Sequence, residues 1–143
     1  HSATLYEQDF YGWIQHNIAL LRQGRWAEID TEILIEELDS MARRDRHELV
    51  SHLIILIAHL LKWQYQAEHR SRSWRSSIIE QRKQVTRQLK LSPSLKPFLM
   101  DAIQEAYPDG VDIAMKETRL PKSTFPNTCP YTLEQLFDDE YYL

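Results

Sequence analysis

The sequence predicts an all-α protein, a helical bundle of about five to six helices that forms a single domain over residues 4–143. Three observations indicate this fold. An apolar run of helical length lies in the middle of the chain, two capping-box patterns mark helix starts, and only 3 glycines are present for hairpin turns. No stretch alternates apolar and polar residues as a strand does. We expect His1, Ser2 and Ala3 to be an expression remnant.

Residues 47–66, HELVSHLIILIAHLLKWQYQ, are predicted to form the central helix. Between Leu53 and Leu61 only His59 interrupts the apolar side chains. At about 100° per residue these side chains fill one broad face, and covering it contributes roughly 1.5 to 3 kcal/mol per large side chain. Two or more neighbouring helices must therefore pack around this segment.

Two helices are predicted before the central one. The first begins at the capping-box pattern of residues 4–7 and ends at Gly24, a residue that stops helices readily. The second is capped by Asp30 and runs into the charged patch of residues 43–46, where we expect a turn or a kink.

Further helices are predicted after a polar connection that follows Gln66. A helix at 73–91 packs antiparallel to the central helix and ends before Pro93. The remaining predicted elements are a helix at 95–107 ended by Pro108 and Gly110, a helix at 109–119, and a short helix capped by Thr132.

Composition excludes several classes of protein. No apolar run reaches the roughly 18 to 20 residues of a membrane helix, and no secretory leader is present, so we expect a cytoplasmic protein without membrane association. Cys129 is the only cysteine, which excludes an internal disulfide and a metal cage built from thiolates alone. No cofactor is expected.

Charge is unevenly distributed around a net value of −4. Residues 43–96, called the basic middle here, hold 12 Lys or Arg residues and 4 Asp or Glu residues, and both ends of the chain are acidic. Two interpretations remain open: the acidic ends pack against the basic middle, or an anionic partner binds there.

Glu37 projects into the apolar arc of its helix, between Ile33 and Met41, whereas Glu36 projects to the solvent side. A carboxylate on a packing face must be paired, neutralised or bound to a ligand. A role as a general base or a ligand-holding acid is the alternative to a structural bond. The structural partners we expect are a tryptophan N–H, Arg70, Arg72 or Arg82.

His52 and His59 lie seven residues apart, which places them about 10 Å apart along one helix. That separation is too long for one metal ion, so no metal site is predicted, and both histidines belong to the polar side of the helix. A metal shared between one histidine and Glu37 or Glu80 is the alternative.

Arg46 and His52 fit the R-x(4–6)-H signature of HEPN-type helical ribonucleases. In such an enzyme the arginine would stabilise the scissile phosphate and the histidine would move a proton, without a metal.

Aromatic and arginine residues gather between the central helix and the next one. Trp63 and Tyr65 precede the run from His69 to Arg75, which contains Arg70, Arg72 and Trp74. Arginines beside aromatic rings suit phosphate contacts and base stacking. They equally suit a helix junction in which arginine stacks on tryptophan and pairs with carboxylates such as Glu37 and Glu80.

Several stretches resemble a known family when they are taken together in order: YEQDFYGWI, LIEELDSMARRDRHEL, HLLKWQYQ, RSRSWRSSIIEQR and FPNTCPYTLEQLFD. They resemble the helical bacterial family called domain of unknown function 29. The resemblance implies a single-domain, all-α, soluble bacterial protein and no particular activity. The family's distinctive polar and aromatic positions are Glu37, His59, Trp63, Gln64, Tyr65, Arg70, Arg72, Trp74, Glu80 and Arg82.

We therefore expect a non-enzymatic interaction module, monomeric or homo-oligomeric, that presents the basic middle to a protein or an anionic partner. A partly buried polar network is expected at the helix junction, built from Glu37, His59, Arg70, Arg72, Trp74 and Arg82. The alternative is a nucleic-acid-binding protein or a HEPN-like ribonuclease that uses Arg46 and His52.

Overall fold

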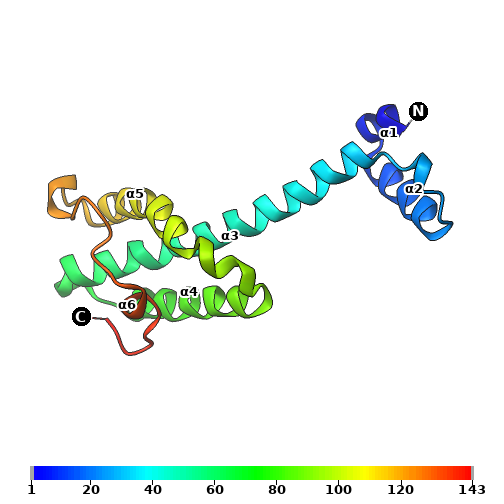
Figure 1. The fold of residues 1–143 in the computed structure, drawn as a ribbon. Helices are drawn as coiled ribbons and strands as arrows, with labels where there is room; N and C mark the ends of the chain where they lie inside the picture. The colour runs from blue at the N-terminus through cyan, green and yellow to red at the C-terminus, as the bar shows by residue number, and fades with distance from the viewer. Residues whose placement is uncertain (1, 143) are drawn as a thin grey trace. The chain divides into compact units, whose positions relative to one another are not determined.

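The computed structural model describes residues 2–142, with side chains from residue 4 onward. Over these residues it contains six α-helices and no strand, so the all-α prediction is confirmed (Figure 1). The chain divides into two compact units, of which the first ends at Arg44 and the second begins at Asp45. A single domain over residues 4–143 stays a prediction.

The first unit begins with α1 (Ser2–Gln8) and α2 (Phe10–Arg22). One helix was expected here, beginning at a Thr4 cap, and this prediction is wrong in two respects. Thr4 lies inside α1, and the helix is interrupted at Asp9. The Asp9 carboxylate accepts a hydrogen bond from the Gly12 backbone N–H at 2.9 Å and so caps α2. The predicted stop is confirmed, because Gly24 adopts a φ of 69° just after α2 ends.

Aromatic side chains hold α1 and α2 together. The Tyr6 ring packs edge-on against the rings of Phe10 and Trp13, with centroids 5.5 and 5.1 Å away. Trp13 Nε1 donates a hydrogen bond to the Asp30 carboxylate at 3.2 Å, which ties the start of the next helix to α2. That next helix begins at Thr31, as the sequence predicted.

The two helices predicted on either side of residues 43–46 are a single helix, α3 (Thr31–Tyr65). The prediction of a turn or kink at this charged patch is therefore wrong. The patch contains neither glycine nor proline, and its residues are compatible with a helix. Arg43 also bonds Asp39 one turn earlier at 3.0 Å, which supports the helix across the patch.

In the second unit, α4 (Arg72–Leu91) runs antiparallel to the C-terminal part of α3, as predicted. The hydrogen bonds between the two helices fix this register. Gln88 near the end of α4 donates to the Asp45 carbonyl at 2.7 Å, whereas Gln81 in the middle of α4 bonds His52 at 2.7 Å. The Ser71 hydroxyl caps α4 by accepting from the Trp74 N–H.

The helix α5 (Leu99–Thr118) corrects the prediction of two helices at 95–107 and 109–119. Pro108 and Gly110 were expected to end a helix, yet both lie inside α5. Gly110 is the close-approach point of α5 and α3, because a Cβ there would lie 3.0 Å from Ile57 Cγ2. Tight packing against α3 thus accounts for the glycine without a helix end.

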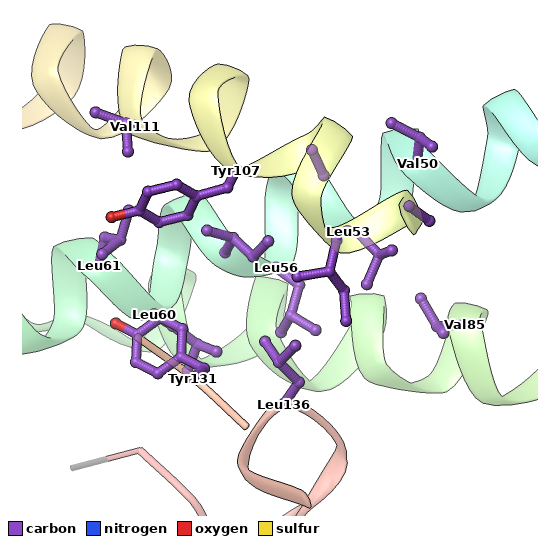
Figure 2. Packing of buried hydrophobic residues seen from close by; sticks show 14 of the residues in the cluster. Val50, Leu53, Leu56, Leu60, Leu61, Val85, Tyr107, Val111, Tyr131 and Leu136 are labelled. Carbon is purple, nitrogen blue, oxygen red and sulfur yellow. The ribbon is translucent and has the colours of Figure 1, made fainter. Parts of the chain in front are cut away.

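The short helix α6 (Leu133–Phe137) confirms the predicted capping box, in which Thr132 and Gln135 satisfy each other's backbone N–H groups. Its Leu136 side chain is fully buried against residues of α3 (Figure 2). The figure shows Leu53, Leu56 and Leu60 of α3 surrounded by side chains of α4, α5 and α6. The predicted central apolar helix therefore forms the middle of this core.

None of the helices in the described part of the chain combines the length and the apolar character needed to cross a membrane.

Candidate functional site

One face of α4, together with the segment that follows α6, forms a groove of about 670 Å³. The α4 side chains recur at spacings of three and four and so lie on one side of the helix. We call this site the α4 groove. Its lining consists of Arg75, Ile79, Arg82, Lys83, Thr86, Arg87 and Lys90 from α4 and Asp139, Glu140 and Tyr142 from the C-terminal segment.

Arg82 lies at the base of the α4 groove and is only 2% exposed. Its Nε donates to the Leu136 carbonyl at 2.8 Å, and its Nη2 donates to the carbonyls of Gln135 and Tyr141 at 3.0 and 2.7 Å. The Tyr142 ring centroid lies 5.4 Å from the guanidinium carbon. The buried cation is therefore held by backbone carbonyls and an aromatic ring.

The Nη1 atom of Arg82 is buried and donates no hydrogen bond of normal distance and angle to residues 2–142, so it is left without a partner among the described residues. No carboxylate in the described part of the chain lies within 4.0 Å of this guanidinium. Burial lowers the pKa of Arg82, and the charges of Tyr142, Asp139 and Asp138, together with a side-chain hydrogen bond to Tyr142, oppose that shift. Because arginine keeps its proton in proteins, the groove carries a buried positive charge that no carboxylate of the described residues pairs with directly.

The outer part of the groove is also cationic. Lys83, Arg87 and Lys90 are exposed, and no carboxylate of the described residues pairs with them within 4.0 Å. The Arg75 guanidinium lies 5.4 Å from the Tyr142 ring centroid. The lining thus brings together five cationic side chains and two carboxylates, those of Asp139 and Glu140.

The predicted aromatic junction is formed in part. The Arg70 guanidinium stacks 5.0 Å from the Trp63 ring centroid, and its Nε donates to the Trp63 carbonyl at 2.8 Å. Tyr65 packs edge-on against the Phe125 ring, and the hydroxyl of Tyr131 donates to Gln64 at 2.8 Å. These contacts match the junction interpretation, in which arginine stacks on tryptophan.

Trp74 contacts a different cation from those predicted. Lys62 follows the apolar run of the central helix and is 3% exposed, and its Nζ lies 4.6 Å from the Trp74 ring centroid. The same ammonium pairs with Glu117 of α5. Nothing in the spacing around Lys62 signals this pair, because Glu117 lies 55 positions away in sequence. Arg72 is exposed and belongs to neither contact.

The two carboxylates assigned to the junction have other partners. Glu37 is partly buried while Glu36 is exposed, as predicted. The hydrogen-bond partner of Glu37 is the Tyr6 hydroxyl and not an arginine or a tryptophan N–H. This hydrogen bond raises the pKa of Tyr6. Glu80 is exposed and accepts a hydrogen bond from Gln84 at 2.7 Å. The expected link from Glu37 to the arginines is therefore wrong, because Glu37 bonds a residue of the first unit.

The histidines of α3 have partners within the second unit. His59 Nδ1 bonds the Ile55 carbonyl at 2.8 Å, and burial lowers the pKa of this imidazole. His52 Nδ1 bonds Gln81, and its Nε2 lies 3.6 Å from the Glu48 carboxylate. No group of three His, Cys, Asp or Glu side chains that could hold a metal ion occurs among the described residues.

Arg46 and His52, the residues of the ribonuclease alternative, do not line the α4 groove. The Arg46 guanidinium lies over the ring of Phe98, 5.9 Å from its centroid. The sequence named Arg82 as a member of the network at the helix junction and did not single out Lys83, Arg87 or Lys90. Their spacing along the predicted helix at 73–91 was the available signal.

A family model described as "Domain of unknown function DUF29" matches residues 5–142. No curated protein and no solved structure matches the chain.

Proposed function

The chain belongs to the DUF29 family, and we propose that it is a non-enzymatic interaction module that binds an anionic, phosphate-bearing partner in the α4 groove. The observation that carries this proposal is the buried Arg82 guanidinium in a lining of five cationic side chains, with no carboxylate of the described residues within 4.0 Å of it.

Charge accounts for the choice of an anion. Backbone carbonyls satisfy part of the hydrogen-bonding capacity of Arg82, but they carry no net charge to balance the buried cation. A phosphate in the α4 groove would supply negative charge close to this guanidinium and beside Lys83 and Arg87. Charge-assisted hydrogen bonds contribute about 1.5 to 3 kcal/mol each.

The extent of the cationic stripe favours a ligand with several phosphate groups. Arg75 and Lys90 are fifteen positions apart, which corresponds to about 22 Å along α4. One phosphate group at Arg82 would leave Arg87 and Lys90 without an anion. A chain of phosphates, such as a polyphosphate or a nucleic-acid backbone, would reach both parts of the groove.

The groove lining supports binding more than catalysis. It offers five cationic side chains, the Ile79 and Tyr142 surfaces and the Thr86 hydroxyl for contacts with an anion, beside the two carboxylates of Asp139 and Glu140. A ribonuclease that uses Arg46 and His52 stays a prediction, because those residues lie outside this lining.

Isothermal titration calorimetry with inorganic tripolyphosphate tests the proposal. We expect saturable binding at low salt that weakens as salt rises, because phosphate contacts release counterions. The double variant Lys83→Glu, Arg87→Glu should bind at least about tenfold more weakly. The matched control Lys116→Glu, Lys122→Glu changes the net charge equally at exposed positions outside the groove and should bind as the parent does.

Absence of binding at low salt, or an equal loss in the two double variants, would contradict a site in the α4 groove. Fluorescence polarisation with a labelled RNA forms a second arm. If the groove accepts a nucleic-acid backbone, RNA should bind and tripolyphosphate should compete with it. Shortening of the RNA that is lost in His52→Ala would replace the non-enzymatic proposal with the ribonuclease.

A further inference from the structure

Acidic residues that follow α6 share the α4 groove with the cations of α4. We call residues 138–140 the acidic turn; its Asp139 and Glu140 line the groove beside Arg75, Arg82, Lys83, Arg87 and Lys90. Neither carboxylate lies within 4.0 Å of a lysine or arginine nitrogen of the described residues. The groove therefore contains five positive and two negative charges that act on the same space without forming direct ion pairs.

Hydrogen bonds fix the backbone of the acidic turn and leave two of its carboxylates available to act on a ligand. The backbone N–H groups of Glu140 and Tyr141 donate to the carboxylate and the carbonyl of Asp138, both at 3.0 Å. Arg82 holds the turn from both sides, through carbonyls of α6 and of Tyr141. Asp138 thus shapes the turn, whereas Asp139 and Glu140 are exposed and line the groove.

The charges of the acidic turn act on the cations that would bind an anion. Asp139 is close enough to Arg82 for its charge to oppose the fall in pKa that burial causes at this guanidinium. Charges interact across about 8 Å at physiological ionic strength, so this effect needs no direct ion pair. A carboxylate that stabilises the guanidinium must equally repel a phosphate bound beside it, and the repulsion grows in proportion to the charge of the ligand.

We propose that Asp139 and Glu140 form an autoinhibitory pair, which lowers the affinity of the α4 groove for phosphate-bearing ligands. The inference rests on the proposed function, because it concerns the strength of anion binding at the same site. It combines the two interpretations of the charge distribution: an acidic end of the described chain lies on the basic middle, and the excess of cations remains available to an anion. Neutralising the pair therefore strengthens anion binding.

Isothermal titration calorimetry with tripolyphosphate compares the parent protein with the double variant Asp139→Asn, Glu140→Gln. These replacements keep the shape of both side chains and leave the carbonyls that bind Arg82 in place, whereas deletion of the segment would remove the Tyr141 carbonyl. At about 20 mM salt the variant should bind about tenfold more tightly, because two repulsive charges are absent. Unchanged helical circular dichroism verifies that the variant folds as the parent does.

A matched control separates local repulsion from net charge. Glu105→Gln, Asp109→Asn changes the net charge equally at exposed positions of α5 outside the groove, and it should bind tripolyphosphate as the parent does. The gain in Asp139→Asn, Glu140→Gln should be smaller for pyrophosphate than for tripolyphosphate, because pyrophosphate carries less charge. It should also shrink between about 20 mM and about 200 mM salt, because the range of the repulsion shortens as ionic strength rises.

The outcomes distinguish this inference from the proposed function. If the parent binds tripolyphosphate and Asp139→Asn, Glu140→Gln binds no more tightly, autoinhibition is overturned while anion binding in the groove stands. Equal gains in this variant and in the Glu105→Gln, Asp109→Asn control would also overturn it, because net charge and not position would then be the cause. Absence of binding by the parent and by both variants would overturn the proposed function and the inference together.

Discussion

Arg82 of α4 donates a hydrogen bond from its Nε to the carbonyl oxygen of Leu136 at 2.8 Å, which joins the middle of α4 to the end of α6. Its Nη2 extends the same attachment to Gln135 and Tyr141. One buried side chain therefore fixes the C-terminal segment that forms a wall of the α4 groove. The same side chain lines the groove, and its buried Nη1 has no partner among the described residues.

Arg82→Lys should lower the free energy of unfolding by about 2 to 4 kcal/mol, because one ammonium cannot donate to three separate carbonyls and each unsatisfied buried acceptor is costly. Urea titration measures this loss. Limited proteolysis should at the same time show faster cleavage between residues 133 and 142. Arg87→Lys, an exposed change of the same chemistry, is the control, and an equal loss in both variants would contradict a tether at Arg82.

Glu117→Gln should destabilise the protein by about 1 to 3 kcal/mol, because it leaves the buried Lys62 ammonium without its anion, while the half-exposed position of Glu117 moderates the effect. Chemical denaturation is the measurement. Combining the change with Lys62→Met should recover part of the stability, since Met fills a similar volume without a charge. A double variant with a lower free energy of unfolding than both single variants would show that this pairing is not what keeps Lys62 in place.

Gly110→Ala should lower the free energy of unfolding by about 1 to 3 kcal/mol. A methyl group there would lie 3.0 Å from Ile57 Cγ2 and 3.3 Å from the Ile54 carbonyl oxygen. Elsewhere in a helix the same change would stabilise. A double-mutant cycle with Ile57→Ala provides the check, since removing that side chain makes room for the methyl group. Additive effects of the two changes would rule out the close contact as the cause.

His59 should make stability depend on pH in a defined direction. Burial holds the pKa of His59 below its unfolded value of about 6.5, and the Lys62 charge acts in the same direction. The unfolded chain then binds more protons than the folded one below that value, so the contribution is complete above about pH 6.5 and is lost as pH falls.

Urea titrations at about pH 7.5 and about pH 5.5 measure the size of this loss. We expect His59→Gln to lose less stability between the two conditions than the parent protein does. His47→Gln changes an exposed histidine of the same helix and serves as control. The assignment fails if the two variants show the same dependence on pH.

Local patterns predicted local structure well. The capping box at Thr132 and the stop before Pro93 depend on residues that lie within one turn of each other, and the structure confirms both. The charged patch of residues 43–46 was misjudged, because charge alone does not end a helix when neither glycine nor proline is present. Gly110 was misjudged for a related reason, since its small size serves a contact with α3.

Contacts between distant residues could not be predicted. The partner of Glu37 is Tyr6, and the partner of Lys62 is Glu117, and no spacing connects either pair along the sequence. The sequence did identify Arg82 as a distinctive residue, but not the carbonyls that hold it. Those belong to residues more than 50 positions later, and only the folded chain brings them to α4.

The most direct test of anion binding in the α4 groove is an NMR titration that follows the arginine side-chain N–H signals while tripolyphosphate is added. We expect the guanidinium signals of Arg82 to shift and to saturate with the dissociation constant found by calorimetry, while those of Arg25 in the first unit stay unchanged. Unchanged Arg82 signals, with shifts only at exposed arginines, would contradict a ligand beside the Arg82 guanidinium.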